Sequence, residues 1–307
     1  SEMCIRDRNE IQKWGLTDYV GAVTDGTYGA VGLDFKSPHT GLAAKKVWFF
    51  FDKTYVCLGT DISSRMKNQV LTTVNQCLLN GQVTVSDADG IHPQERGSRM
   101  KKGVRWVVHD RVGYYFLNKE NVILSNQRTE GSWKIANRQT TTPTDIIQQD
   151  VFTLSVDHGS YPNNEGYAYM VVPSADPLSI EKQVEEEGVV VLANCPDVQA
   201  VRHDGLNMAY AVFYKGGTLR IHDKIVVEMD APGMLMVKYN DAGEILTLGV
   251  SDPTRFMKKL HLSVNQRIVG TAQENIQTEW DGKQALTRIS VDLPQNEYAG
   301  KSVIYNK

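Results

Sequence analysis

Two short motifs place a histidine beside a carboxylate, the pairing that can remove a proton from a substrate. His109-Asp110 ends one apolar run, and Asp157-His158-Gly159 ends another. Neighbouring residues of a strand point to opposite faces of a sheet, so His109 and Asp110 cannot jointly serve one site. We therefore expect His109-Asp110 in a hairpin and His158 as a hydrogen-bonding turn residue. No catalytic residue is assigned to this chain.

The densest positive segment spans residues 96–105 and includes Arg96 and Arg99. Guanidinium groups bind sulfate and carboxylate through charge-assisted hydrogen bonds, so these two arginines are candidate ligands for an acidic polymer. The alternative, a solvated hairpin tip, is the interpretation that the pattern favours. Asp87 and Asp89 lie nearby, but acidic pairs are common in turns. We predict no metal site and no cofactor, while a structural or activating calcium ion stays open.

Composition excludes several classes of protein. The 307 residues are 41% hydrophobic and 22% charged with a net charge of −3, typical of a soluble globular chain and unlike a basic nucleic-acid-binding protein. No apolar run reaches the ~18 residues that a membrane-spanning helix needs. The four cysteines show neither a disulfide framework nor metal-ligand spacing. We expect no nucleic-acid partner, no membrane partner and a monomer.

Short apolar runs rich in Val, Thr, Tyr and Phe, separated by turn residues, predict an all-β fold. One expected strand covers residues 133–137. A polar segment at 176–189 has room for one short helix and is typical of a linker. We therefore expect a large antiparallel β super-sandwich at residues 9–175 and a smaller antiparallel β-sandwich at residues 190–307.

The first eight residues do not look native. Residues 2–8 read EMCIRDR, which is the translation of a sequencing-transposon adapter. We expect residues 1–8 to be an artefact of library preparation and the chain to be an N-terminally truncated fragment. A signal peptide would then be absent because it was lost upstream.

An ordered series of motifs covers nearly the whole chain after Asn9. In the first part it comprises Thr24-Asp25-Gly26, Tyr28-Gly29, residues 44–52 (AKKVWFFFD), Val56-Cys57-Leu58-Gly59 and residues 72–76 (TTVNQ). In the second part it comprises residues 198–201 (VQAV), 211–214 (AVFY) and 250–253 (VSDP). This series resembles polysaccharide lyase family 8, of the chondroitin AC and hyaluronate lyase type.

The resemblance implies a secreted or periplasmic bacterial enzyme that depolymerises chondroitin sulfate or hyaluronan by β-elimination at a uronic acid. It also implies that the catalytic Asn, His, Tyr and Arg lie on an N-terminal α/α-toroid, which would be the missing partner of this chain. This fragment alone is therefore expected to be inactive. The alternative is a free-standing carbohydrate-binding β-sandwich protein with no catalytic role.

Trp14 is the third candidate for substrate binding. It lies with Gly15 in a polar, loop-like stretch before the first expected strands. The family places an aromatic residue near this point against the sugar-binding cleft, and aromatic faces suit the C–H surfaces of sugars. A tryptophan packed in the domain interior is the alternative.

Overall fold

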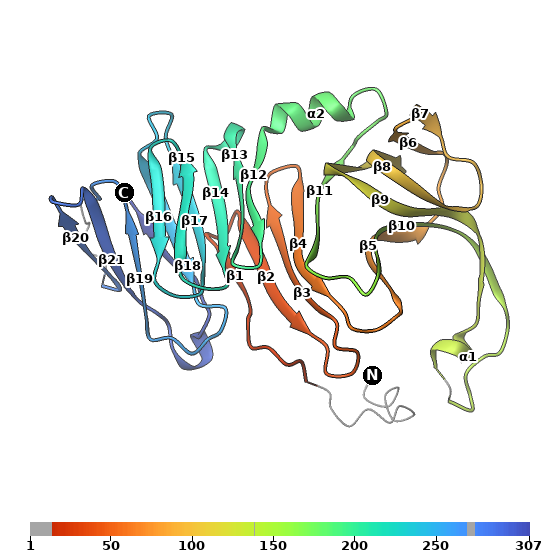
Figure 1. Ribbon diagram of the computed structural model, residues 1–307, viewed down its shortest axis with the longest axis horizontal. Helices are drawn as coiled ribbons and strands as arrows, with labels where there is room; N and C mark the ends of the chain where they lie inside the picture. The colour runs from red at the N-terminus through yellow and green to blue at the C-terminus, as the bar shows by residue number, and fades with distance from the viewer. Residues whose placement is uncertain (1–13, 138, 269–273) are drawn as a thin grey trace.

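Three antiparallel sheets form the protein in a computed structural model, which describes residues 14–137, 139–268 and 274–307 (Figure 1). The sheets confirm the expected all-β fold of a large sandwich followed by a smaller one. Residues 1–8, to which the adapter interpretation applies, lie outside the described residues. No helix among the described residues is long and apolar enough to cross a membrane.

The first sheet, sheet A, has eleven strands in the order β1-β2-β3-β4-β11-β9-β8-β6-β7, with β10 joined to β9 and β5 joined to β10. Its strands are β1 (Val20–Thr24), β2 (Gly29–Lys36), β3 (Ala43–Phe50), β4 (Tyr55–Ser63), β5 (Gln69–Leu78), β6 (Val83–Asp87), β7 (Gly90–Pro93), β8 (Ser98–His109), β9 (Val112–Gly131), β10 (Ile147–Ser160) and β11 (Glu165–Pro173).

Sheet A folds back on itself because the long strand β9 changes partner along its length. Its first residues, Val112 to Phe116, pair with β11, whereas Val122 to Gly131 pair with β10. Strands that pass from one layer to another in this way form the corners of sandwiches. The fold encloses a core of buried side chains that includes Phe116, Leu124, Phe152, Leu154 and Tyr169.

The other two sheets come from the C-terminal part of the chain. Sheet B has the order β12-β13-β14-β17-β18-β22, and sheet C the order β15-β16-β19-β21-β20. Their bounds are β12 (Val189–Cys195), β13 (Val198–His203), β14 (Met208–Phe213), β15 (Gly217–His222), β16 (Ile225–Met229), β17 (Gly233–Tyr239), β18 (Ile245–Ser251), β19 (Lys259–Val264), β20 (Ile276–Asp281), β21 (Leu286–Asp292) and β22 (Val303–Asn306).

Sheet B is buried on both faces. One face packs against the β1–β4 side of sheet A through residues such as Tyr210, Val212 and Met236. The other face packs against sheet C through residues such as Ala211, Leu235 and Val237. All six residues of β14 are buried, which explains its unbroken apolar sequence MAYAVF. The molecule is therefore a stack in which sheet B is the shared middle layer (Figure 1).

Helices are short. The expected helix of segment 176–189 is α2 (Ile180–Glu187), which packs its buried Ile180 against Gly113 at the start of β9. The expected strand at 133–137 is wrong: these residues form α1 (Trp133–Ala136), because the Ser132 hydroxyl accepts a hydrogen bond from the Lys134 N–H and caps a helical turn. Two 3₁₀ turns occur at Asp204–Leu206 and Asn296–Tyr298.

Gly59 provides a test of the packing between β4 and β11. Gly59 pairs with Tyr167, and a Cβ at Gly59 would lie 2.1 Å from the buried Tyr167 ring. We expect Gly59→Ala to lower the free energy of unfolding by about 1–3 kcal/mol, as overpacked cores do. Gly15→Ala is the control, because nothing lies within 4 Å of that position. Urea unfolding measures both, and equal stabilities of the two variants would contradict the packing.

Candidate functional site

A polar pocket of about 300 Å³ lies beside Arg96, where four segments of sheet A meet. The β5–β6 turn contributes Gln82, the β7–β8 loop contributes Gln94 and Arg96, and β9 and β10 contribute Asn126 and Asp150. Hydrogen-bond donors and acceptors converge here on one small volume. The pocket therefore offers a recognition site for a polar group.

Arg96 is held in place by two contacts that no local motif reveals. Its guanidinium donates to the Asn126 carbonyl oxygen at 3.3 Å and to Asp150 Oδ2 at 2.9 Å. Asp150 also lies 3.8 Å from Arg128 Nε, so one carboxylate faces two guanidinium groups. The side chain of Arg96 is 59% exposed, so the group is accessible to a ligand although it is paired.

Asn126 is the most deeply buried polar residue that lines the pocket, at 4% exposed. Its Nδ2 donates to the Gln94 carbonyl oxygen at 3.2 Å, and this bond fixes the orientation of the amide. Its Oδ1 is buried and accepts no hydrogen bond from the described residues. A buried acceptor is costly when unsatisfied, so this oxygen requires a donor from water or from a ligand hydroxyl.

Arg99, the second predicted arginine, lies on β8 and pairs with Glu95 at 2.6 Å. Both side chains are more than half exposed, so this pair contributes little to stability and leaves Arg99 available to an anion. Arg105 pairs in the same manner with Glu181 of α2, at 3.4 Å. Much of the basic segment is thus paired with acidic side chains, of which Asp150 and Glu181 are distant in the sequence.

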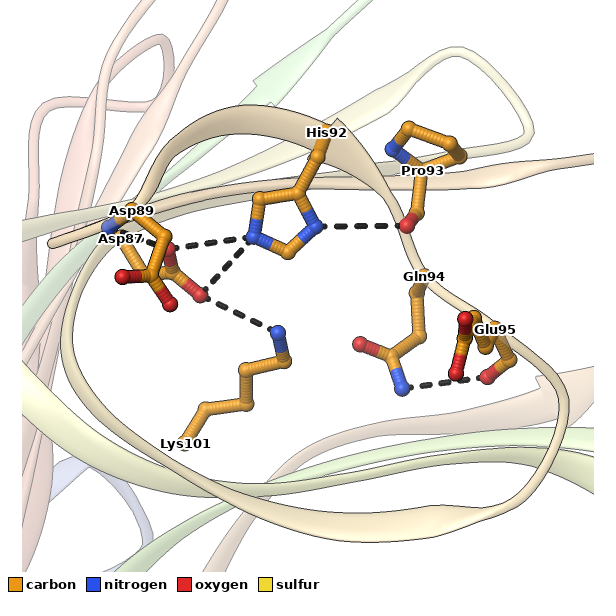
Figure 2. Close-up of polar contacts among 7 residues, drawn as sticks. All are labelled: Asp87, Asp89, His92, Pro93, Gln94, Glu95 and Lys101. Atoms are coloured by element: carbon orange, nitrogen blue, oxygen red, sulfur yellow. Dashed lines mark hydrogen bonds and ion pairs between the residues drawn. The ribbon is translucent and has the colours of Figure 1, made fainter.

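Figure 2 shows why Asp87 is not a free cation ligand. Its carboxylate accepts hydrogen bonds from Lys101 Nζ and His92 Nε2, both at 3.1 Å, and from the Asp89 N–H at 3.0 Å. Burial would raise the pKa of Asp87, but these hydrogen bonds outweigh it and hold the pKa below its ordinary value. No cluster of three or more potential metal-binding side chains occurs among the described residues.

Trp14 is 81% exposed, at the start of the described chain. The following segment runs along β2, where the Leu16 N–H donates to the Lys36 carbonyl oxygen. In the described part of the chain, Trp14 forms no hydrogen bond with Arg96 or Arg99. The pocket is lined by Arg96 but by neither Trp14 nor Arg99. The structure therefore exposes all three predicted residues without gathering them into one site.

The two histidines of the His/Asp motifs make structural contacts. His109 is 1% exposed, stacks on Phe152, and accepts the Asn80 N–H at 3.0 Å. Asp110 lies in the turn after it with φ of 49°. His158 is 8% exposed and bonds the Thr72 hydroxyl at 2.9 Å, and burial lowers its pKa to about 4.

The arrangement of the sheets is that of a polysaccharide lyase. A solved chondroitinase AC lyase matches 97% of this chain and 42% of its own, with a TM-score of 0.79 and 34% sequence identity. Two family models match the chain: the super-sandwich domain of polysaccharide lyase family 8 at residues 3–184, and its C-terminal β-sandwich domain at residues 190–261. The chain belongs to polysaccharide lyase family 8.

Relatives of known name agree. Chondroitinase-AC of Pedobacter heparinus is 35% identical over 304 residues, which are 97% of this chain and 40% of that protein. A hyaluronate lyase of Thermasporomyces composti is 29% identical over 92% of this chain and 36% of its own length. The chain thus spans about two fifths of the length of these relatives.

The Asp87 cluster gives a pH-dependent prediction. Because the folded-state pKa of Asp87 is depressed below 3.8, its carboxylate stabilises the fold above that pH, and the contribution is lost as pH falls through the folded value. We expect Asp87→Asn to cost about 1–3 kcal/mol of unfolding free energy at pH 7 and less below pH 3.8.

The control for this prediction is Asp89→Asn, since the Asp89 side chain is exposed. It should change stability by less than about 0.5 kcal/mol at either pH. Denaturant unfolding at both pH values provides the measurement. An Asp87→Asn penalty that is as large in acid as at neutral pH would show that the carboxylate charge is irrelevant.

Proposed function

We propose that this chain is the β portion of a lyase that depolymerises chondroitin sulfate or hyaluronan by β-elimination at the uronic acid. The observation that carries the proposal is the 35% identity to a chondroitinase-AC along 97% of the chain. The proposed substrate is an acidic polysaccharide, and exposed Arg96 and Arg99 offer charge-assisted contacts to it.

We further propose that the catalytic groups lie outside these 307 residues, on an α/α-toroid that precedes them. Elimination requires a base for the C5 proton and stabilisation of the charge that develops on the carboxylate. Core tyrosines such as Tyr114, Tyr167 and Tyr210 stay protonated near neutral pH and so offer no base, because burial raises the pKa of Tyr114 to about 12 and those of the other two further. His158, already bonded to Thr72, is buried away from a polymer.

The remaining features of the proposal follow from the family. The parent enzyme would act as a monomer. It would act outside the cell or in the periplasm, because its polymeric substrate is extracellular. The central domain would cover residues 9–175 and the C-terminal domain residues 190–307, joined by the segment that contains α2. Support for this division is the position of the two family matches, which end at residue 184 and begin at residue 190.

A lyase assay tests the division of labour. The purified chain, incubated with chondroitin sulfate or hyaluronan, should produce no ultraviolet absorbance from unsaturated uronate. The chondroitinase-AC of Pedobacter heparinus serves as the positive control, and the same chain joined to its natural upstream region should gain activity. Turnover by the chain alone would refute the proposed location of the catalytic groups, and an inactive parent that still binds would favour a carbohydrate-binding protein.

Electrophoresis through gels that contain chondroitin sulfate tests the three candidate binding residues. We expect Arg96→Gln with Arg99→Gln to weaken retardation about tenfold, the equivalent of one lost hydrogen bond to a charged group. Trp14→Ala should also weaken retardation, independently of the two arginine substitutions. Arg220→Ala, on the exposed side of β15, is the matched control. If the variants are retarded as strongly as the unsubstituted chain, these residues do not bind the substrate.

A further inference from the structure

The outward face of sheet C holds a hollow of about 630 Å³, more than twice the volume of the pocket at Arg96. It spans β16, β19, β21 and β20, at the end of the molecule that is farthest from the folded part of sheet A (Figure 1). The inward side chains of the same strands, such as Leu262 and Ile289, fill the core against sheet B. The hollow therefore lies on the side of sheet C that no other sheet covers.

Strand register arranges the side chains of the hollow in two rows. The first row crosses four paired strands and consists of Glu228, Ser263, Arg288 and Glu279. The second consists of Asp230, His261, Ser290 and Gln277. With neighbouring strands about 4.8 Å apart, each row is roughly 14 Å long. Two parallel rows of polar groups suit an elongated ligand that lies across the strands.

Several of these side chains have no interaction partner among the described residues. The carboxylates of Glu228 and Glu279 form no ion pair or hydrogen bond with the described residues, and neither does the Gln277 amide. Elsewhere on the same sheet, Lys259 pairs with Asp292 at 2.9 Å. The hollow thus collects hydrogen-bonding groups that the described residues leave unpaired and open to a ligand.

Charge excludes the acidic polysaccharide as the ligand of this hollow. Glu228, Asp230 and Glu279 carry negative charge, whereas Arg288 is the one lining residue with a fixed positive charge. Its guanidinium is held by Asp281 Oδ2 at 2.9 Å and Gln284 Oε1 at 2.8 Å, outside the rows. A sulfated or carboxylated polymer would meet unpaired carboxylates and be repelled.

The mixture of donors and acceptors selects among the remaining ligands. A cationic ligand could pair with the carboxylates but would leave the donors of the Gln277 amide unsatisfied. A hydroxyl group both donates and accepts, so rows of alternating carboxylate, hydroxyl, imidazole and amide groups match a polyol. We propose that the outward face of sheet C is a binding site for an uncharged, hydroxyl-rich glycan, separate from the acidic substrate.

Such a site would anchor the enzyme to neutral polysaccharide around its substrate without competing for it. The proposal does not depend on the lyase function, because the hollow contains none of Trp14, Arg96 or Arg99. Binding to a neutral glycan and binding to chondroitin sulfate would therefore respond to different substitutions.

Affinity electrophoresis of the full chain tests the proposal, with hydroxyethyl cellulose, galactomannan or laminarin in the gel, and chondroitin sulfate or chitosan in parallel gels. We expect retardation by at least one neutral glycan. Gln277→Ala with Glu279→Ala should weaken it about five- to tenfold, the effect of losing one or two hydrogen bonds. Ser290→Tyr, which fills the hollow, should weaken it as well.

Glu186→Ala on the exposed side of α2 is the control and should leave retardation unchanged. Thermal unfolding checks that each variant is folded. If one of the two variants of the hollow fails to fold, the other still tests the proposal. Absence of retardation by all three neutral glycans would overturn the proposal. So would retardation by chitosan or chondroitin sulfate alone, or neutral-glycan binding that is unaffected by both substitutions of the hollow.

Discussion

Burial of sheet B on both faces is the constraint on which the rest of the structure depends. Its strands β14 and β17 bury apolar side chains in two separate cores at once. Polar contacts cross from sheet A to this layer, as when the Tyr19 hydroxyl donates to the Phe213 carbonyl oxygen at 2.9 Å and the Ser251 hydroxyl to the Ala22 carbonyl oxygen at 2.8 Å. The two sandwiches therefore share one structural layer.

This shared layer separates two surfaces of different chemistry. Sheet A presents arginines at its folded end, where their guanidinium groups could bind an acidic polymer. Sheet C presents unpaired carboxylates and hydroxyls on its outward face, where the same polymer would be repelled. The proposed acidic substrate and the proposed neutral glycan would therefore bind at separate surfaces, with sheet B between them.

The sequence predicted the strands whose apolar alternation is strong, but weaker or non-local signals escaped it. The strand expected at residues 133–137 was overruled by a local Ser132 cap. The partners of Arg96, 30 and 54 residues away, meet it only because β9 pairs with both β8 and β10, which no local motif encodes.

Hydrogen exchange of the native chain tests the shared layer most directly. If sheet B joins both sandwiches, the amides of β14 and β17 should exchange slowest and should open only with sheets A and C in one global event. Loss of protection in sheets B and C together, while the β1–β4 part of sheet A stays protected, would contradict this arrangement and show two sandwiches that unfold independently.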